Sequence, residues 1–198
     1  MTIHDGDTFE HNGRNFRATV SVDCTQETPW KWDEDHGVVS KWTRRDKAPG
    51  ERILATDGFR KQFYDFAATM KIAKRDAWGL GEDALAALSE RLGRAPTRGE
   101  IIAESVEGDF KYLKDWYDDK WHYVCVCVDL LDEDGELTGD SDSLGMVEDN
   151  DSKYLDSVAR ECADNILSEV KGRRDREDTL AAARMEAARP DMYSAQSL

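Results

Sequence analysis

The segment Trp121–Leu131 limits what this chain can fold into more than any other stretch of the sequence. It reads Trp-His-Tyr-Val-Cys-Val-Cys-Val-Asp-Leu-Leu, so bulky or apolar side chains stand at both odd and even positions. Valine and aromatic residues favour extended backbone, and a strand that is apolar on both sides is typical of the middle of a sheet. The sequence therefore predicts a central strand with both faces covered. Its apolar run is far shorter than the roughly 20 residues that span a bilayer, so we expect no membrane segment.

Two hairpins are predicted from turn residues. Asp132–Gly135 forms a turn after the central strand, and Ser143–Glu148 is the expected return strand. Near the N-terminus, Asn12-Gly13 supplies the positive φ angles of a two-residue turn between the strands Thr8–His11 and Arg14–Asp23. Apolar and polar residues alternate along the second of these strands, which predicts a buried even-numbered face: Phe16, Ala18, Val20 and Val22.

Helical spacing of apolar residues predicts the helices between the hairpins. The first covers about residues 65–77, and we expect the glycines of Trp78–Gly81 to end it in the left-handed conformation. The second covers about residues 82–92. Thr97 and Glu100 form a capping box that begins a longer helix reaching about residue 119.

The C-terminal part predicts a helix over about residues 152–171 that meets Gly172, then a polar helix, Pro190 and a mobile tail. We expect an α+β fold with a single globular domain over residues 1–172, followed by the polar helix and tail over residues 173–198. The antiparallel sheet combines the N-terminal hairpin, the 52–64 region and the 121–148 hairpin. It packs against three to four helices.

Negative charge is concentrated in one short segment. The chain has 42 acidic and 27 basic side chains, for a formal charge of −15, and between Trp121 and Ser152 ten carboxylates occur without a lysine or arginine. Such a field attracts basic protein surfaces or cations and repels nucleic acid over about 8–10 Å at physiological salt. Direct nucleic-acid binding is therefore not expected. Nine of these carboxylates are the predicted partner-binding residues: Asp129, Asp132, Glu133, Asp134, Glu136, Asp140, Asp142, Glu148 and Asp149.

A second segment is basic and rich in aromatic residues. Between Trp30 and Trp78, eleven basic residues are interleaved with tryptophan, phenylalanine and tyrosine, a composition typical of surfaces that contact nucleic acid or an acidic partner. Eight acidic residues lower the net charge of residues 30–79 to +3, and most of the aromatic residues fit a hydrophobic core. A small basic loop remains as a candidate for phosphate contact: Lys41, Arg44, Arg45 and Lys47.

The cysteines do not predict a zinc site. Cys125 and Cys127 are two residues apart on a strand, so their thiols point to one side, and Cys24 and Cys162 would have to complete the four ligands. This spacing is not that of a zinc knuckle, and cysteines in a buried strand are typical of packing. Because Met1–Asp5 has neither the cationic start nor the apolar region of a secretory signal, we expect a reducing cytoplasm, in which disulfides are rare. We therefore predict neither a metal nor a cofactor.

The sequence also gives little support for a calcium site or for a catalytic site. A calcium-binding loop around the acidic turn would place Leu130 and Ser141 at its two anchoring positions, where neither can serve. The sequence has no nucleotide-binding glycine motif, nucleophile elbow or metalloprotease motif. We predict no catalytic residue, although acidic side chains can act without a linear motif and an enzyme is not excluded. The four histidines fit structural roles: His4, His11, His36 and His122.

Five short motifs resemble a family of uncharacterised accessory proteins from tailed bacteriophages and prophages. The likeness covers roughly residues 30–170 and brings no established activity or catalytic residue. It implies a small accessory gene product in the cytoplasm of an infected bacterium. The motifs are Lys47–Arg52 after Trp42, Phe63–Phe66, Asp76–Gly79, Pro96–Glu100 and Trp121–Val124.

The charge pattern and this resemblance give one leading expectation and two alternatives. The leading one is a non-catalytic phage protein that binds a basic surface of a host or phage protein, as a DNA mimic that inhibits a host defence or replication factor. Carboxylates on a rigid hairpin can compete for a groove that DNA occupies. The alternatives are an accessory enzyme or nucleotide-handling protein with a cleft beside the central strand, and a phage structural or assembly component. The sequence leaves the oligomeric state open.

Overall fold

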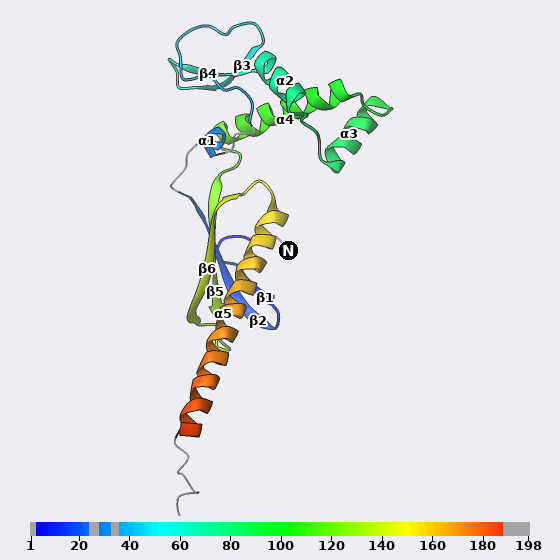
Figure 1. Cartoon of the computed structure of the whole chain (residues 1–198). Coiled ribbons are helices and arrows are strands. Elements are labelled where there is room, and N and C mark those ends of the chain that lie inside the picture. Colours follow the sequence, from blue (N-terminus) through cyan, green and yellow to red (C-terminus); the bar gives the residue numbers. More distant parts are fainter. Residues whose placement is uncertain (1–2, 24–27, 33–35, 188–198) are drawn as a thin grey trace, which may run out of the picture. The chain divides into compact units, whose positions relative to one another are not determined.

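A computed structural model gives the fold and describes residues 3–23, 28–32 and 36–187 (Figure 1). The fold class is α+β, as predicted. The chain divides into two compact units, which the sequence analysis did not separate. The terminal unit combines residues 1–23 with residues 123–198, and the inserted unit comprises residues 24–122.

The terminal unit contains a four-stranded antiparallel sheet. Its strands are β1 (Thr8–His11), β2 (Arg14–Val22), β5 (Tyr123–Leu131) and β6 (Leu137–Glu148), in the spatial order β1-β2-β5-β6. The N-terminal hairpin is confirmed, since both residues of its Asn12-Gly13 turn have positive φ. Strand β5 is central, as predicted. Strand β6 begins six residues earlier than expected, so the carboxylates expected in a loop stand on a strand.

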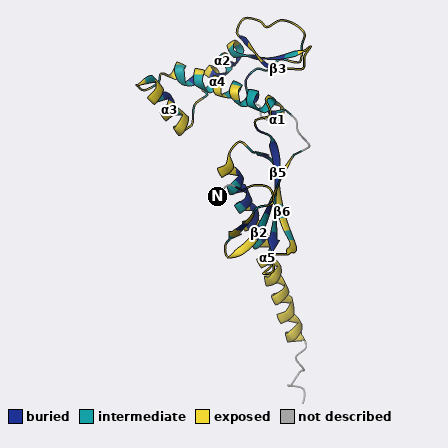
Figure 2. Ribbon diagram, turned by 180° about the vertical axis from the view of Figure 1, so that it is seen from behind, coloured by how far each residue is buried: buried dark blue, intermediate teal, exposed yellow. Residues whose placement is uncertain are grey.

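One long helix, α5 (Ser152–Ala187), packs on one face of this sheet (Figures 1 and 2). The prediction that both faces of β5 are covered is wrong, because the odd-numbered side from Cys125 to Asp129 is only half-buried. The even-numbered side forms the core with β1, β2 and α5. That core includes Phe9, Phe16, Ala18, Val124, Val126, Val128, Leu130, Leu155, Val158, Cys162 and Ile166.

Helix α5 does not stop at Gly172. It continues without interruption to Ala187, so the separate polar helix expected after Gly172 is the second half of one element. Residues 173–187 are exposed, as Figure 2 shows, because beyond the pair of Arg173 with Asp140 the helix extends past the sheet. The predicted mobile tail beyond Pro190 lies outside the described residues.

The inserted unit has a sheet of its own. Strands β3 (Glu51–Thr56) and β4 (Lys61–Asp65) form a two-stranded antiparallel sheet, and Val39 adds an isolated bridge to Tyr64. The expectation that the 52–64 region joins the sheet of the two other hairpins is therefore wrong. A short helix, α1 (Pro29–Trp32), precedes this sheet in the chain.

Three further helices complete the inserted unit: α2 (Phe66–Arg75), α3 (Glu82–Leu92) and α4 (Arg98–Tyr117). The capping box is confirmed, since the Thr97 hydroxyl accepts from the Glu100 amide and the Glu100 carboxylate accepts from the Thr97 amide at 2.7 Å. The left-handed residue after α2 is Ala77 rather than a glycine of Trp78–Gly81. The core of this unit contains Leu54, Tyr64, Ala73, Ile102, Val106 and Leu113.

Candidate functional site

The turn between β5 and β6 is held rigidly by its own first residue. One carboxylate oxygen of Asp132 accepts the amides of Asp134 at 3.0 Å and Glu136 at 2.9 Å. The Asp132 amide donates to the Glu136 carbonyl at 2.9 Å, and Gly135 takes the positive φ of 83° that the turn requires. Because these bonds fix the backbone, the side chains of the turn project from a fixed base.

Four carboxylates stand together on this turn, and we call them the acidic tip: Asp132, Glu133, Asp134 and Glu136. All four residues are exposed. Within the part of the chain that the structure describes, no lysine or arginine forms an ion pair with any of them. Apart from the two amides that Asp132 accepts, their mutual repulsion is offset by solvent and salt, and the tip is a local source of negative potential.

The other five predicted partner-binding carboxylates lie elsewhere. Asp140 pairs with Arg173 of α5 at 2.8 Å, and Asp142 accepts from the Asn165 amide at 2.9 Å, so both contact the helix. Asp129 is half-buried on the uncovered face of the sheet, opposite Arg17 in the strand register. Glu148 and Asp149 follow at the far end of the twelve-residue strand β6. The structure thus gathers four of the nine residues at one place.

A groove of about 450 Å³ lies beside the acidic tip. It is lined by the buried residues Phe9 and Leu131, by Glu133 and Asp134 of the tip, and by Glu10. Sequence reasoning missed this groove because it depends on the register that places β1 near the end of β5. Its remaining lining residues are Thr8, Asn15, Arg17 and Gly135.

The predicted phosphate-contact residues have different surroundings. Arg45 donates two hydrogen bonds to the buried carboxylate of Glu51, at 2.5 and 2.6 Å, and its guanidinium lies 4.8 Å from the centre of the Phe63 ring. Arg45 and the Ala48 amide hold the pKa of Glu51 down at about 2. Arg45 therefore has a structural role in the fold, as the partner of Glu51. Lys41, Arg44 and Lys47 are exposed, with no ion pair to any described residue.

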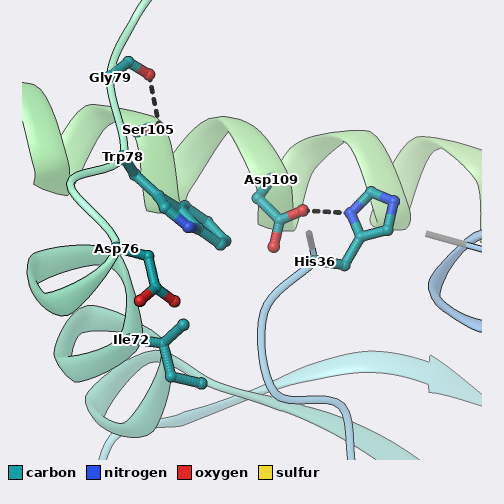
Figure 3. Close-up of a pocket in the computed structure, with 7 residues that line it drawn as sticks. All are labelled: His36, Ile72, Asp76, Trp78, Gly79, Ser105 and Asp109. Carbon is teal, nitrogen blue, oxygen red and sulfur yellow. Dashed lines mark hydrogen bonds and ion pairs between the residues drawn. The ribbon is translucent and has the colours of Figure 1, made fainter. Parts of the chain in front are cut away.

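The inserted unit contains a cleft of about 550 Å³ (Figure 3). Helix α4 contributes Ser105 and Asp109, while Asp76 and Trp78 come from the segment after α2. The Ser105 hydroxyl donates to the Gly79 carbonyl at 2.9 Å and so ties that segment to α4. Asp76 already accepts two hydrogen bonds from Arg75, at 2.6 and 2.7 Å.

Asp109 of α4 lines this cleft and binds three groups from other parts of the unit, an arrangement that we call the Asp109 lock. It accepts hydrogen bonds from His36 Nδ1 at 2.6 Å, from the Gly37 amide at 2.9 Å and from the Tyr64 hydroxyl at 2.5 Å. Burial and the adjacent carboxylate raise the pKa of Tyr64 above its usual value. The His36 ring also stacks on Tyr112. Donors therefore already compensate both carboxylates of the cleft, whereas no described lysine or arginine forms an ion pair with the acidic tip.

The cysteines do not form a metal centre in the described ranges. The thiols of Cys125 and Cys127 are 3.6 Å apart on the uncovered face of the sheet, whereas Cys162 is buried on the helix side. Burial is the main reason why the pKa values of Cys127 and Cys162 are raised, the second to about 11. No group of three or more described histidine, cysteine or acidic side chains is placed to hold a metal ion. Cys24 lies outside the described residues.

Comparison with protein-family models, with curated proteins and with solved structures found no match for this chain. Among the helices of residues 3–23, 28–32 and 36–187, none has both the length and the apolar character required to span a bilayer.

Proposed function

We propose that this chain is a non-catalytic protein-binding module whose acidic tip docks on a basic surface of another protein. The observation that carries the proposal is the set of four exposed carboxylates on one hydrogen-bonded turn, with no ion pair to a described lysine or arginine. A partner's lysines and arginines would meet charges whose backbone is already ordered, so little entropy is lost on binding. Charge complementarity of this kind chiefly sets partner choice and association rate.

The resemblance to phage accessory proteins supplies the proposed setting, the cytoplasm of an infected bacterium. There the partner is a host or phage protein with a basic groove, such as a defence or replication factor that binds DNA. Duplex DNA carries one charge per about 1.7 Å of its axis, so four carboxylates match the charge of roughly 7 Å of duplex. The mimicry that we propose is therefore of a short phosphate stretch at the mouth of a groove.

A pull-down from bacterial lysate tests this function. The immobilised full chain should retain a protein whose recovery falls steeply as salt is raised. The test variant combines Asp132→Asn, Glu133→Gln, Asp134→Asn and Glu136→Gln, and it should lose that protein. Asparagine at position 132 keeps a side-chain oxygen that can accept the two turn amides.

The matched control removes four charges from the same unit. It combines Asp175→Asn, Glu177→Gln, Asp178→Asn and Glu186→Gln on the exposed half of α5, so the net charge changes by the same amount. This control should keep full recovery. Equal recovery by the tip variant and the wild type, or equal losses in both variants, would show that the acidic tip is not the docking site.

A further inference from the structure

The turn between β3 and β4 is hydrogen-bonded by its own aspartate, as the acidic tip is, but it presents an aromatic ring. One oxygen of Asp57 accepts the amides of Phe59 at 3.3 Å and Arg60 at 2.8 Å, and the other accepts from the Arg60 guanidinium at 2.8 Å. These bonds hold the pKa of Asp57 below its usual value. Gly58 takes a positive φ of 85°.

Phe59 is the most exposed large hydrophobic side chain of the described residues, with 86% of its surface accessible. Trp42 and Ile53 of the same unit are 37% and 43% exposed, and the Arg60 guanidinium lies 5.7 Å from the centre of the Trp42 ring. Exposed aromatic rings on ordered backbone are typical anchors of protein interfaces. No feature of the fold of this unit requires Phe59 to be a large apolar residue.

Basic side chains with no acidic partner among the described residues lie near this turn. Thr43 and Lys61 exchange two backbone hydrogen bonds of 2.9 and 2.7 Å, which places residues 41–44 beside the end of β4. Arg60 is paired with Asp57. Lys41, Arg44 and Lys61 make no ion pair with any residue in the described ranges. We call Lys41, Arg44, Lys61 and Phe59 the basic hairpin face.

The groove beside the acidic tip has the opposite chemistry. Its lining includes the apolar side chains of Phe9 and Leu131, and its three carboxylates outnumber the one basic residue, Arg17. Its volume of about 450 Å³ has room for a phenyl ring. An aromatic ring near basic residues and a groove lined by apolar side chains and carboxylates are complementary in chemistry and charge.

We infer that the basic hairpin face of one copy of this chain docks on the acidic tip of a second copy, with Phe59 in the groove. The inference rests on the proposed function, because it names the basic surface that the acidic tip binds. The contact is heterologous, since the two surfaces differ, so each copy retains one free surface and copies add head to tail. The net charge of −15 keeps copies apart at long range, and the local attraction acts within about 8–10 Å.

Charge reversal on each surface gives a decisive test. The tip variant combines Glu133→Lys, Asp134→Lys and Glu136→Lys, and it leaves Asp132 in place because that carboxylate holds the turn. The face variant combines Lys41→Glu, Arg44→Glu and Lys61→Glu. Analytical ultracentrifugation of the full chain should show mass that rises with concentration for the wild type and monomers for either variant alone.

An equimolar mixture of the two variants should associate again, because each variant keeps the native surface that the other has lost. This rescue also shows that both variants are folded. Phe59→Ser should weaken wild-type association at least tenfold, whereas Tyr154→Ser, a change of another exposed ring on α5, should not. A monomeric wild type, a mixture that stays monomeric, or a wild type whose lysines bind a single-stranded oligonucleotide instead would each overturn the inference.

The two proposals predict different results, so the experiments can reject one without rejecting the other. If the acidic tip binds only an external partner, the tip variant loses that partner in the pull-down, the face variant keeps it, and the wild type stays monomeric. If the tip binds nothing, recovery in the pull-down and association both survive the change of the tip. Head-to-tail binding alone predicts loss of association in both variants and its return on mixing.

Discussion

The backbone amide of Asp23 donates a hydrogen bond to the carbonyl of Tyr123 at 2.9 Å, across ninety-nine intervening residues. The pairing continues the ladder in which Val22 stands opposite Val124. The two residues that flank the inserted unit are therefore adjacent in space. Without residues 24–122, the four strands of the terminal unit would follow one another as a simple antiparallel meander.

We expect the terminal unit to fold without the inserted unit. Replacing residues 24–122 by a short glycine-rich turn keeps the β2–β5 ladder and the core between the sheet and α5. Circular dichroism should show the helix and strand content of this unit, and denaturant should unfold it in one cooperative transition. A chain that is disordered after the replacement would mean that the inserted unit is required to form the sheet.

Glu51 should stabilise the inserted unit through its paired carboxylate. Its side chain is only 7% exposed, and it accepts two bonds from Arg45 and one from the Ala48 amide at 2.6 Å. Glu51→Gln loses the charge on this acceptor, and hydrogen bonds to charged groups contribute about 1.5–3 kcal/mol. We expect the free energy of unfolding to fall by an amount of that order in chemical denaturation at pH 7.

The pH dependence follows from the lowered pKa of Glu51. Since this pKa is about 2 in the folded protein against an ordinary 4.5, the stabilisation is complete above pH 4.5 and is lost as the pH falls toward 2. The difference in stability between the wild type and Glu51→Gln should therefore shrink over that range. Glu107→Gln, which removes a half-exposed ion pair with Arg52, should cost less than about 1 kcal/mol. A difference that does not change with pH would refute the role of the charge.

Tyr64→Phe tests the lock at Asp109. The change removes one of three donors to a carboxylate that is 9% exposed, while His36 and the Gly37 amide remain. Because a hydrogen bond to a buried charge is lost, we expect the free energy of unfolding to fall by about 1.5–3 kcal/mol with the fold kept. Tyr154→Phe on the surface of α5 is the control and should have no measurable effect. Equal effects in the two variants would argue against the lock.

Local signals predicted local structure well. Asn12-Gly13 predicts its own hairpin and Thr97 with Glu100 predicts its own helix start, since each depends only on neighbouring residues. Gly172 misled because a glycine inside a helix costs only about 0.5–1 kcal/mol, which the helix-forming residues on both sides offset. A glycine in the sequence is therefore not sufficient to predict that a helix ends at that residue.

Contacts that depend on how the chain folds back on itself could not be predicted from the sequence. Arg44 and Arg45 look alike in a linear reading, yet only Arg45 reaches Glu51, because the turn at Ala48 brings that carboxylate back. The groove beside the acidic tip likewise requires Glu10 and Glu133 to line the same space, and only the strand register places them there. The four residues of the acidic tip, by contrast, are close neighbours in the chain, so the sequence alone places them together.

Truncation of α5 should separate its packed half from its exposed half. A chain that ends after Arg174 keeps Val170 against the core and keeps the Arg173–Asp140 pair of 2.8 Å. We expect its thermal midpoint to stay within a few degrees of the full-length value, because residues 175–187 bury little surface. A chain that ends after Ile166 also loses Leu167 and Val170 from the core and should be clearly less stable. Equal losses in the two truncations, measured by thermal unfolding, would show instead that the exposed half supports the fold.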